Sequence, residues 1–196
     1  MEHIIEQIND MDAPDTLNVD GYEIEIYYDQ DAQDPYEWCD QYTTMITMHR
    51  RYNIGQKHSY RGQDYTGWDD LLKQLHKDYN IVVVEPLYMY EHGGVAVSTT
   101  PFSCPWDSGQ FGWVFITREA VKNLQGWKRI TQERRYLLHS YLTSEVKEYN
   151  CYLRGEVYGW SVSKDDEHID GCNGYIGYEY IDDMKKEIIA TIKHSK

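Results

Sequence analysis

Strand-like segments of this sequence come in adjacent pairs, and single helices separate the pairs. Residues 23–29, EIEIYYD, alternate polar and apolar side chains, as a strand with one buried face does. Residues 80–94 form an apolar run that ends at two glycines and leads into a second apolar run, 95–100. Strands joined by short turns pair antiparallel, whereas parallel strands need a long crossover between them. We therefore expect an α+β fold with a largely antiparallel sheet.

The longest helix is predicted over residues 131–153, where Thr131 can cap the start and Gly155 can end the helix. Its apolar stripe consists of Leu138, Leu142, Val146, Tyr149 and Leu153. Shorter helical patterns cover residues 1–10, 65–79, 118–124 and 181–194. We expect three to four helices to pack with the sheet. No repeat or linker interrupts the chain, so residues 1–196 are predicted to form a single domain.

Negative charge is concentrated near the start of the chain. The formal net charge is −14, and residues 1–49 hold thirteen Asp or Glu and no Lys or Arg. The remaining residues hold twenty acids and nineteen bases. Because contacts to phosphates need clusters of Lys and Arg, we expect no direct binding of nucleic acid. A protein partner with a basic surface is expected instead.

Six acids are candidates for the partner-binding surface. Glu23 and Glu25 share one face of the predicted strand, about 6.6 to 6.8 Å apart along it. Phosphates along one DNA strand have a comparable spacing, so such a row could imitate a nucleic-acid backbone. The full set is Glu23, Glu25, Asp29, Asp31, Asp34 and Glu37. The alternative is that these acids only keep the protein in solution.

The acids of residues 29–40 also resemble a calcium-binding loop in their spacing. Asp34 stands where an EF-hand requires Gly, and Asp40 stands where it requires Glu. These two mismatches exclude an EF-hand. A looser divalent-cation site at this acidic loop stays an alternative, and a solvated loop with no cofactor is the expectation.

Residues 99–117, TTPFSCPWDSGQFGWVFIT, form a stretch rich in turn residues between two predicted strands. Prolines and glycines at fixed positions dictate the backbone, so turn chemistry explains every residue type present. In this structural interpretation Trp106 and Phe111 anchor the loop on the sheet, and Asp107 bonds backbone amides.

The alternative interpretation of this stretch is catalytic. Cys104 or Ser108 would be a nucleophile with His92 as its base, and Asp107 is a further catalytic candidate. The G-x-S-x-G motif of α/β-hydrolases is absent. The sequence therefore favours a binding protein over an enzyme, with a small metal-dependent or Cys/Ser hydrolase as the alternative.

Two further groups have candidate roles. Glu145 flanks the apolar stripe of the long helix, where it could serve as a general acid or pair with Arg129, Arg134 or Lys147. The run from His49 to Arg51 could bind a phosphate or pair with the acidic segment before it. In both cases we expect ion pairing.

The four cysteines lie far apart, at Cys39, Cys104, Cys151 and Cys172, and form no C-x-x-C pair. We expect free thiols and no structural zinc. No signal peptide and no apolar run long enough to span a bilayer is recognised, so a cytoplasmic location is predicted. The oligomeric state is left open.

Several segments resemble a family of small proteins encoded by bacteriophages, prophages and other mobile elements. They include EIEIYYDQDAQDP, MHRRYNIG, LYMYEH and EVKEYNCYLRGEVYGW, and the PFSCPWDSGQ-G stretch is the most specific. The resemblance spans roughly residues 23–178 and carries no catalytic residues with it. It implies action on a host or defence component in the bacterial cytoplasm. We therefore expect an accessory protein that binds and inhibits a host protein.

Overall fold

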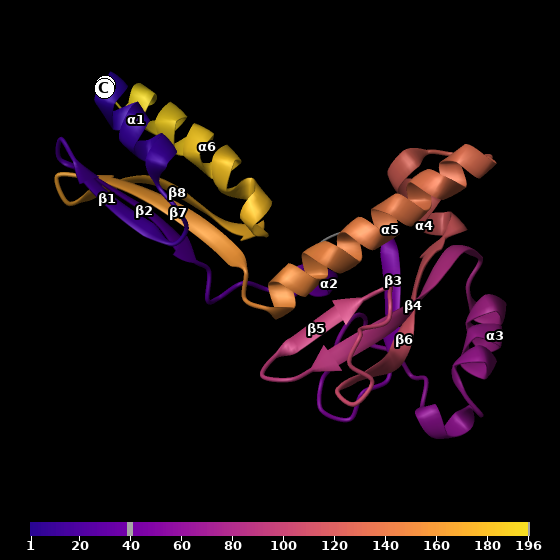
Figure 1. The fold of residues 1–196 in the computed structure, drawn as a ribbon. Helices are drawn as coiled ribbons and strands as arrows, with labels where there is room; N and C mark the ends of the chain where they lie inside the picture. Colours follow the sequence, from indigo (N-terminus) through magenta and orange to yellow (C-terminus); the bar gives the residue numbers. More distant parts are fainter. Residues whose placement is uncertain (39–40, 196) are drawn as a thin grey trace. The chain divides into compact units, whose positions relative to one another are not determined.

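The computed structural model describes residues 1–38 and 41–195 (Figure 1). Its backbone divides into two compact units. Unit 1 comprises Met1–Gln33 and Cys151–Lys196, and unit 2 comprises Asp34–Asn150. The expected single domain stays a prediction. Cys39 and Asp40, named above, lie outside the described residues.

Unit 1 is a four-stranded antiparallel sheet with two helices. Its strands are β1 (Asp15–Val19), β2 (Tyr22–Tyr28), β7 (Val157–Lys164) and β8 (Glu167–Ile176), in the order β1-β2-β7-β8. The helices are α1 (Glu2–Asp10) and α6 (Ile181–His194), with a 3-10 turn, η2 (Tyr178–Tyr180), before α6.

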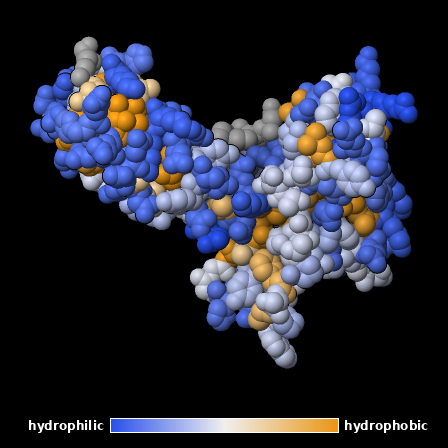
Figure 2. Space-filling model, turned by 45° about the horizontal axis from the view of Figure 1, so that its top comes forward, coloured by the Kyte–Doolittle hydropathy of each residue, from blue (hydrophilic) through white to orange (hydrophobic). Residues whose placement is uncertain are grey.

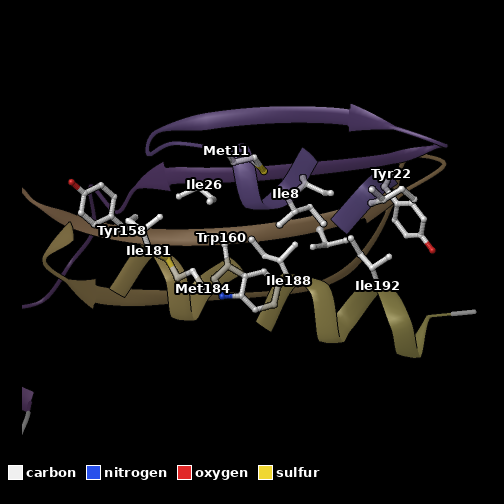
Figure 3. Packing of buried hydrophobic residues seen from close by; sticks show 13 residues of the cluster. Ile8, Met11, Tyr22, Ile26, Tyr158, Trp160, Ile181, Met184, Ile188 and Ile192 are labelled. Carbon is white, nitrogen blue, oxygen red and sulfur yellow. The ribbon is translucent and has the colours of Figure 1, made fainter. Parts of the chain in front are cut away.

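The core of unit 1 lies between this sheet and its helices (Figure 3). Strand β2 buries Tyr22, Ile24 and Ile26, and the acids between them lie on the opposite face. From α6, Met184 and Ile188 pack into the same cluster. Each such side chain, when fully buried, stabilises the fold by about 1.5–3 kcal/mol. The alternation predicted for residues 23–29 is thereby confirmed.

Unit 2 is a second antiparallel sheet, with the strand order β3-β6-β4-β5. Its strands are β3 (Thr43–Thr47), β4 (Ile81–Glu91), β5 (Val95–Ser98) and β6 (Ser108–Thr117). Its helical elements are α2 (Pro35–Trp38), η1 (Gly62–Asp64), α3 (Trp68–Asp78), α4 (Arg118–Gln125) and α5 (Gln132–Leu153). Only the last three residues of α5, from Cys151 to Leu153, belong to unit 1.

Helices α3 and α5 contribute separately to the core of unit 2. Leu71 and Leu75 of α3 pack with Ile46, Trp113 and Phe115 from the sheet. Helix α5 crosses the strands, since His139 contacts Glu85 of β4, Glu145 bonds β3 and Asn150 bonds β5. Its predicted apolar stripe is buried at Leu138, Leu142, Val146 and Tyr149.

The α+β class, the antiparallel pairing and the long helix are confirmed. The strands form two sheets, and two segments for which no strand was predicted hold strands. Residues 13–22 contain β1, and residues 164–171 contain a two-residue turn, Asp165-Asp166, after which β8 begins. Strand β1 lies at a sheet edge and buries Leu17 and Val19 only partly, so its apolar pattern is weak. No helix in the described part of the chain is long and apolar enough to cross a membrane.

Candidate functional site

Almost all of the excess negative charge belongs to unit 1. Its residues include nineteen Asp or Glu and six Lys or Arg, a formal net charge of −13. Unit 2 holds fourteen acids and thirteen bases. Ten of the thirteen acids of residues 1–49 therefore belong to the same folded unit as the acids near the end of the chain. Figure 2 shows hydrophilic side chains over most of the visible surface of this unit, at the left of the view.

Two tight turns bring acids together at one end of the unit 1 sheet. Asp20 lies in the turn between β1 and β2, and Asp165-Asp166 form the turn between β7 and β8. The backbone N–H of Asp165 donates to the carbonyl of Gly21 at 2.9 Å, which fixes the turns side by side. All three aspartates have positive φ, which Asp tolerates better than most residues. Together with the exposed Glu167 they form an acidic end.

Glu23 and Glu25 lie on the sheet face opposite the helices, as predicted. Ser163 and Ser161 of β7 pair with them across the sheet. The Ser161 hydroxyl donates to the Glu25 carboxylate at 3.4 Å, and Glu23 is exposed. In the loop after β2, the Asp31 N–H donates to the Asp29 carboxylate at 3.2 Å. These four acids form the part of the candidate partner surface that belongs to unit 1.

Asp34 and Glu37 belong to unit 2 and have bonding partners there. The Asp34 carboxylate accepts the Tyr149 hydroxyl at 3.0 Å and the Tyr36 N–H at 2.9 Å, at the start of α2. Glu37 pairs with Lys57 at 3.0 Å. Asp34 thus has a structural role that its sequence position did not indicate. Among the described residues, no group of three or more His, Cys, Asp or Glu is arranged to hold a metal ion.

Asp107 is the centre of the contacts in the loop that precedes β6. The Cys104 thiol donates to its carboxylate at 3.6 Å, and His92 Nδ1 lies 3.3 Å from the same oxygen. The Ser108 hydroxyl donates to the Cys104 carbonyl at 2.5 Å. The structure therefore brings the four predicted loop residues together. Asp107 separates the imidazole from the sulfur, and the hydroxyl proton of Ser108 is directed to a carbonyl.

The predicted anchoring of this loop is half right. Phe111 is buried, with 4% of its surface exposed, and this expectation is confirmed. The expectation for Trp106 was wrong, since 92% of its surface is exposed. Asp107 bonds side chains in place of the expected backbone amides. Phe111 begins a run of six buried residues in β6, Phe111–Ile116, whereas Trp106 precedes the strand and no strand register constrains it.

Glu145 has a different partner from either that was expected. Its carboxylate accepts the backbone N–H groups of Tyr42 at 2.8 Å and Thr43 at 2.9 Å. These groups lie at the start of β3, so Glu145 joins α5 to this strand. These two backbone bonds were not expected, and an ion pair with Arg129, Arg134 or Lys147 stays a prediction. A carboxylate bonded in this way has a positioning role, and its approach to a backbone 102 residues away had no signal in the sequence.

The His49–Arg51 run pairs inside unit 2. The Arg51 guanidinium lies 2.6 Å from the Glu91 carboxylate, and the Tyr52 hydroxyl donates to the same group at 3.1 Å. His49 lies 3.9 Å from Glu91 and stacks on the Tyr52 ring. The expected pairing with the acidic segment at the start of the chain was therefore wrong. Glu91 ends β4, and its role was not foreseen.

The loop after β3, residues 48–61, is held in place by side-chain bonds to the backbone. Gln56 accepts from Met45 N–H at 2.5 Å and donates to the Thr43 carbonyl at 3.1 Å. The Thr47 hydroxyl donates to the Ile54 carbonyl, and His58 Nε2 lies 2.7 Å from the Thr47 carbonyl. The buried His58 Nδ1 has no hydrogen-bond partner among the described residues. Long ordered loops without regular structure are often functional.

This loop borders a cavity of about 700 Å³. Its lining includes His49, Arg50, Tyr52, Lys57 and His58 and contains no Asp or Glu. The size is in the range of small-molecule sites, about 300–1,000 Å³. Because the lining carries cationic groups and no carboxylate, the cavity is suited to binding an anion.

Comparison of the chain with protein-family models, curated proteins and solved structures found no match. A fold alone does not specify an activity, because function depends on the residues of a site. We therefore argue function from the charges and contacts described above.

Proposed function

We propose that this chain is a binding protein whose acidic unit 1 recognises a basic surface on a protein partner. In the phage or mobile-element setting that the family resemblance implies, the partner is a defence or nucleic-acid-handling protein in the host cytoplasm, and binding inhibits it. The observation that carries the proposal is the formal charge of −13 in unit 1.

The placement of the acids supports recognition of a surface that normally faces phosphates. Glu23 and Glu25 lie on one open sheet face, and the turns holding Asp20, Asp165 and Asp166 meet at one end of the same sheet. Proteins that bind nucleic acids present Lys and Arg toward rows of phosphates. A folded unit with carboxylates on a face and at an end offers such a protein alternative contacts and steers its approach.

The hydrolase alternative has less support. A Ser or Cys nucleophile needs a base within hydrogen-bond reach, and that base needs an orienting group. Asp107 contacts both Cys104 and His92, so the carboxylate occupies the place between nucleophile and base. Ser108 directs its proton to the Cys104 carbonyl.

The test is affinity capture with charge-reversed variants. The tagged chain is incubated with nuclease-treated lysate of a bacterial host, and partners are compared with those of a variant in which Glu23, Glu25, Asp29 and Asp31 are replaced by Lys. The matched control replaces four exposed acids of unit 2, namely Asp64, Asp69, Glu119 and Glu133, by Lys. Both variants change the net charge equally.

We expect one stoichiometric partner that is lost with the unit 1 variant and retained with the unit 2 control. Added duplex DNA should displace it, and the complex should weaken as the salt concentration rises. Unchanged capture by a folded unit 1 variant would exclude the acidic face as the binding surface. Turnover of a substrate with no partner captured would support the enzyme alternative.

A further inference from the structure

Trp106 is exposed to solvent on a loop that hydrogen bonds and ring packing hold in place. With 92% of its surface exposed, it is the most exposed large hydrophobic side chain in the described part of the chain. The residues on either side are fixed, because Ser108 bonds the Cys104 carbonyl and Glu91 N–H donates to the Asp107 carbonyl at 2.9 Å. Phe102 packs on the Tyr90 ring, with ring centroids 5.6 Å apart. An indole held outward on a rigid support offers a stacking surface at little entropic cost.

The cavity beside the 48–61 loop supplies positive charge near this indole. Arg50 is exposed and makes no hydrogen bond or ion pair with the described part of the chain. The Lys57 side chain is 91% exposed and pairs with the exposed Glu37. The phenol of Tyr52 lines the same cavity. An Arg guanidinium with free donors matches the oxygens of a phosphate group.

His49 connects the cationic cavity to the indole. It lines the cavity together with Arg50, and it also lines a smaller hollow of about 400 Å³ whose wall includes Trp106. The two carboxylates of that hollow already have cationic neighbours, since Glu91 pairs with Arg51 and Asp107 lies 3.3 Å from His92. The uncompensated charge therefore lies on the Arg50 side, and the exposed ring lies on the Trp106 side.

We propose that this part of unit 2 is a nucleotide-binding site, in which a base stacks on Trp106 and a phosphate group is bound by Arg50. An aromatic ring can stack with any base, and a cation beside it can bind the phosphate group of the same nucleotide. The ligand is either a free mononucleotide or a unit of a single strand. The charge of the whole chain predicts no binding of nucleic acid, and the proposed site differs because its positive charge is local and lies in the nearly neutral unit 2.

The test uses two probes and matched variants of the full chain. Binding of fluorescein-labelled oligothymidine is followed by anisotropy at low salt, and binding of AMP is followed by calorimetry, with inorganic phosphate and adenosine as the separate halves of the ligand. Trp106→Ala is paired with Tyr136→Ala, because Tyr136 is another exposed ring, at 68%. Arg50→Ala is paired with Arg129→Ala, an exposed arginine in the same unit.

We expect Trp106→Ala and Arg50→Ala each to weaken binding of the better probe at least about tenfold, while the two controls change it less than about twofold. If the ligand is a free nucleotide, AMP binds and oligothymidine binds no more tightly. If the ligand is a single strand, oligothymidine binds more tightly than AMP. Equal binding of AMP and inorganic phosphate would overturn the proposal, since the base would then contribute nothing. No binding of either nucleotide probe at millimolar concentration, or no effect of the two variants, would also overturn it.

The two proposals fail separately. The nucleotide site lies in unit 2 and its variants change no acid, whereas the acidic face lies in unit 1. Loss of one activity with the other retained assigns each to its own surface.

Discussion

The carboxylate of Glu145 on α5 accepts the backbone N–H of Thr43, the first residue of β3, at 2.9 Å. It also accepts the preceding N–H at 2.8 Å. Hydrogen bonds to a charged group contribute about 1.5–3 kcal/mol each, and partial exposure reduces this value. Glu145→Ala should therefore lower the free energy of unfolding by about 2 kcal/mol, measured by urea denaturation.

The matched control is Glu133→Ala in the first, exposed turn of the same helix. Glu133→Ala should lower the free energy of unfolding by less than about 1 kcal/mol, because only the interaction with the helix dipole is removed. Equal losses for the two variants would show that Glu145 does not hold β3.

Phe111 and Trp106 should have opposite sensitivities although both are large aromatic residues of one loop and strand. Phe111→Ala leaves a cavity in the core, which costs about 3–5 kcal/mol. Trp106→Ala removes an exposed ring and should change the free energy of unfolding by less than about 0.5 kcal/mol. Thermal or urea unfolding measures both. A large loss with Trp106→Ala would mean that the indole packs on the protein.

This pair shows what the sequence could and could not predict. Phe111 lies in an inner strand of the sheet, at the start of the buried run Phe111–Ile116, so its burial agrees with the apolar run that follows it in the sequence. Trp106 lies in a turn-rich segment, where no periodicity relates a side chain to the core. Periodicity also made the long helix predictable, because its apolar stripe from Leu138 to Leu153 repeats over about four turns. Strand β1 was missed because its five residues are mostly exposed.

Gly112 and Gly109 of β6 give a second matched pair. A Cβ at Gly112 would lie 2.4 Å from the Ile46 carbonyl oxygen, and this backbone atom has no free rotation to avoid it. Gly112→Ala should therefore cost about 1–3 kcal/mol, as overpacking does. A Cβ at Gly109 meets no atom within 4 Å, so Gly109→Ala should be neutral or slightly stabilising. Urea denaturation distinguishes the two, and equal effects would contradict the β3–β6 pairing.

The thiols should differ in reactivity. Burial raises the pKa of Cys151 from 9.0 to about 11, and the Glu156 carboxylate adds to the shift, while Cys172 is exposed. At pH 8 the native Cys151 then holds about 100-fold less thiolate than an ordinary thiol and should react last with iodoacetamide. Mass spectrometry of the labelled peptides measures this order. Modification of Cys151 as fast as Cys172 in folded protein would contradict its burial.

The same shift has a consequence for stability. The folded-state pKa lies above the unfolded value, so ionising Cys151 is less favourable in the folded protein. The contribution of the protonated Cys151 thiol to the free energy of unfolding is therefore complete below pH 9. It falls as the pH rises toward about 11. Cys151→Ser should reduce this alkaline loss, which urea denaturation at pH 8 and pH 10 measures.

Most of the candidate site was beyond sequence reasoning for one physical cause: its contacts join residues that are far apart in the chain. The contact of His92 with Asp107 joins the residue after β4 to the residue before β6, and no local pattern in the sequence indicated it. Glu91 with Arg51, and Glu145 with Thr43, depend on the strand order, which the similar lengths of the strands left open. The partners of charged side chains were therefore not predictable.

Both outer strands of the unit 2 sheet end in contact with a side-chain amide. On β3, the Gln56 side chain accepts the outward N–H of Met45 and donates to the carbonyl of Thr43. On β5, the Asn150 side chain accepts the outward N–H of Val97 at 2.9 Å. An open edge of this kind is where foreign chains add as extra strands and where amyloid growth begins. The side-chain amides of Gln56 and Asn150 therefore occupy backbone groups that an added strand would need. Replacing Gln56 and Asn150 by apolar residues should leave the strand register unchanged and expose these backbone groups to strands of other molecules. Such a loss of solubility would not depend on the net charge.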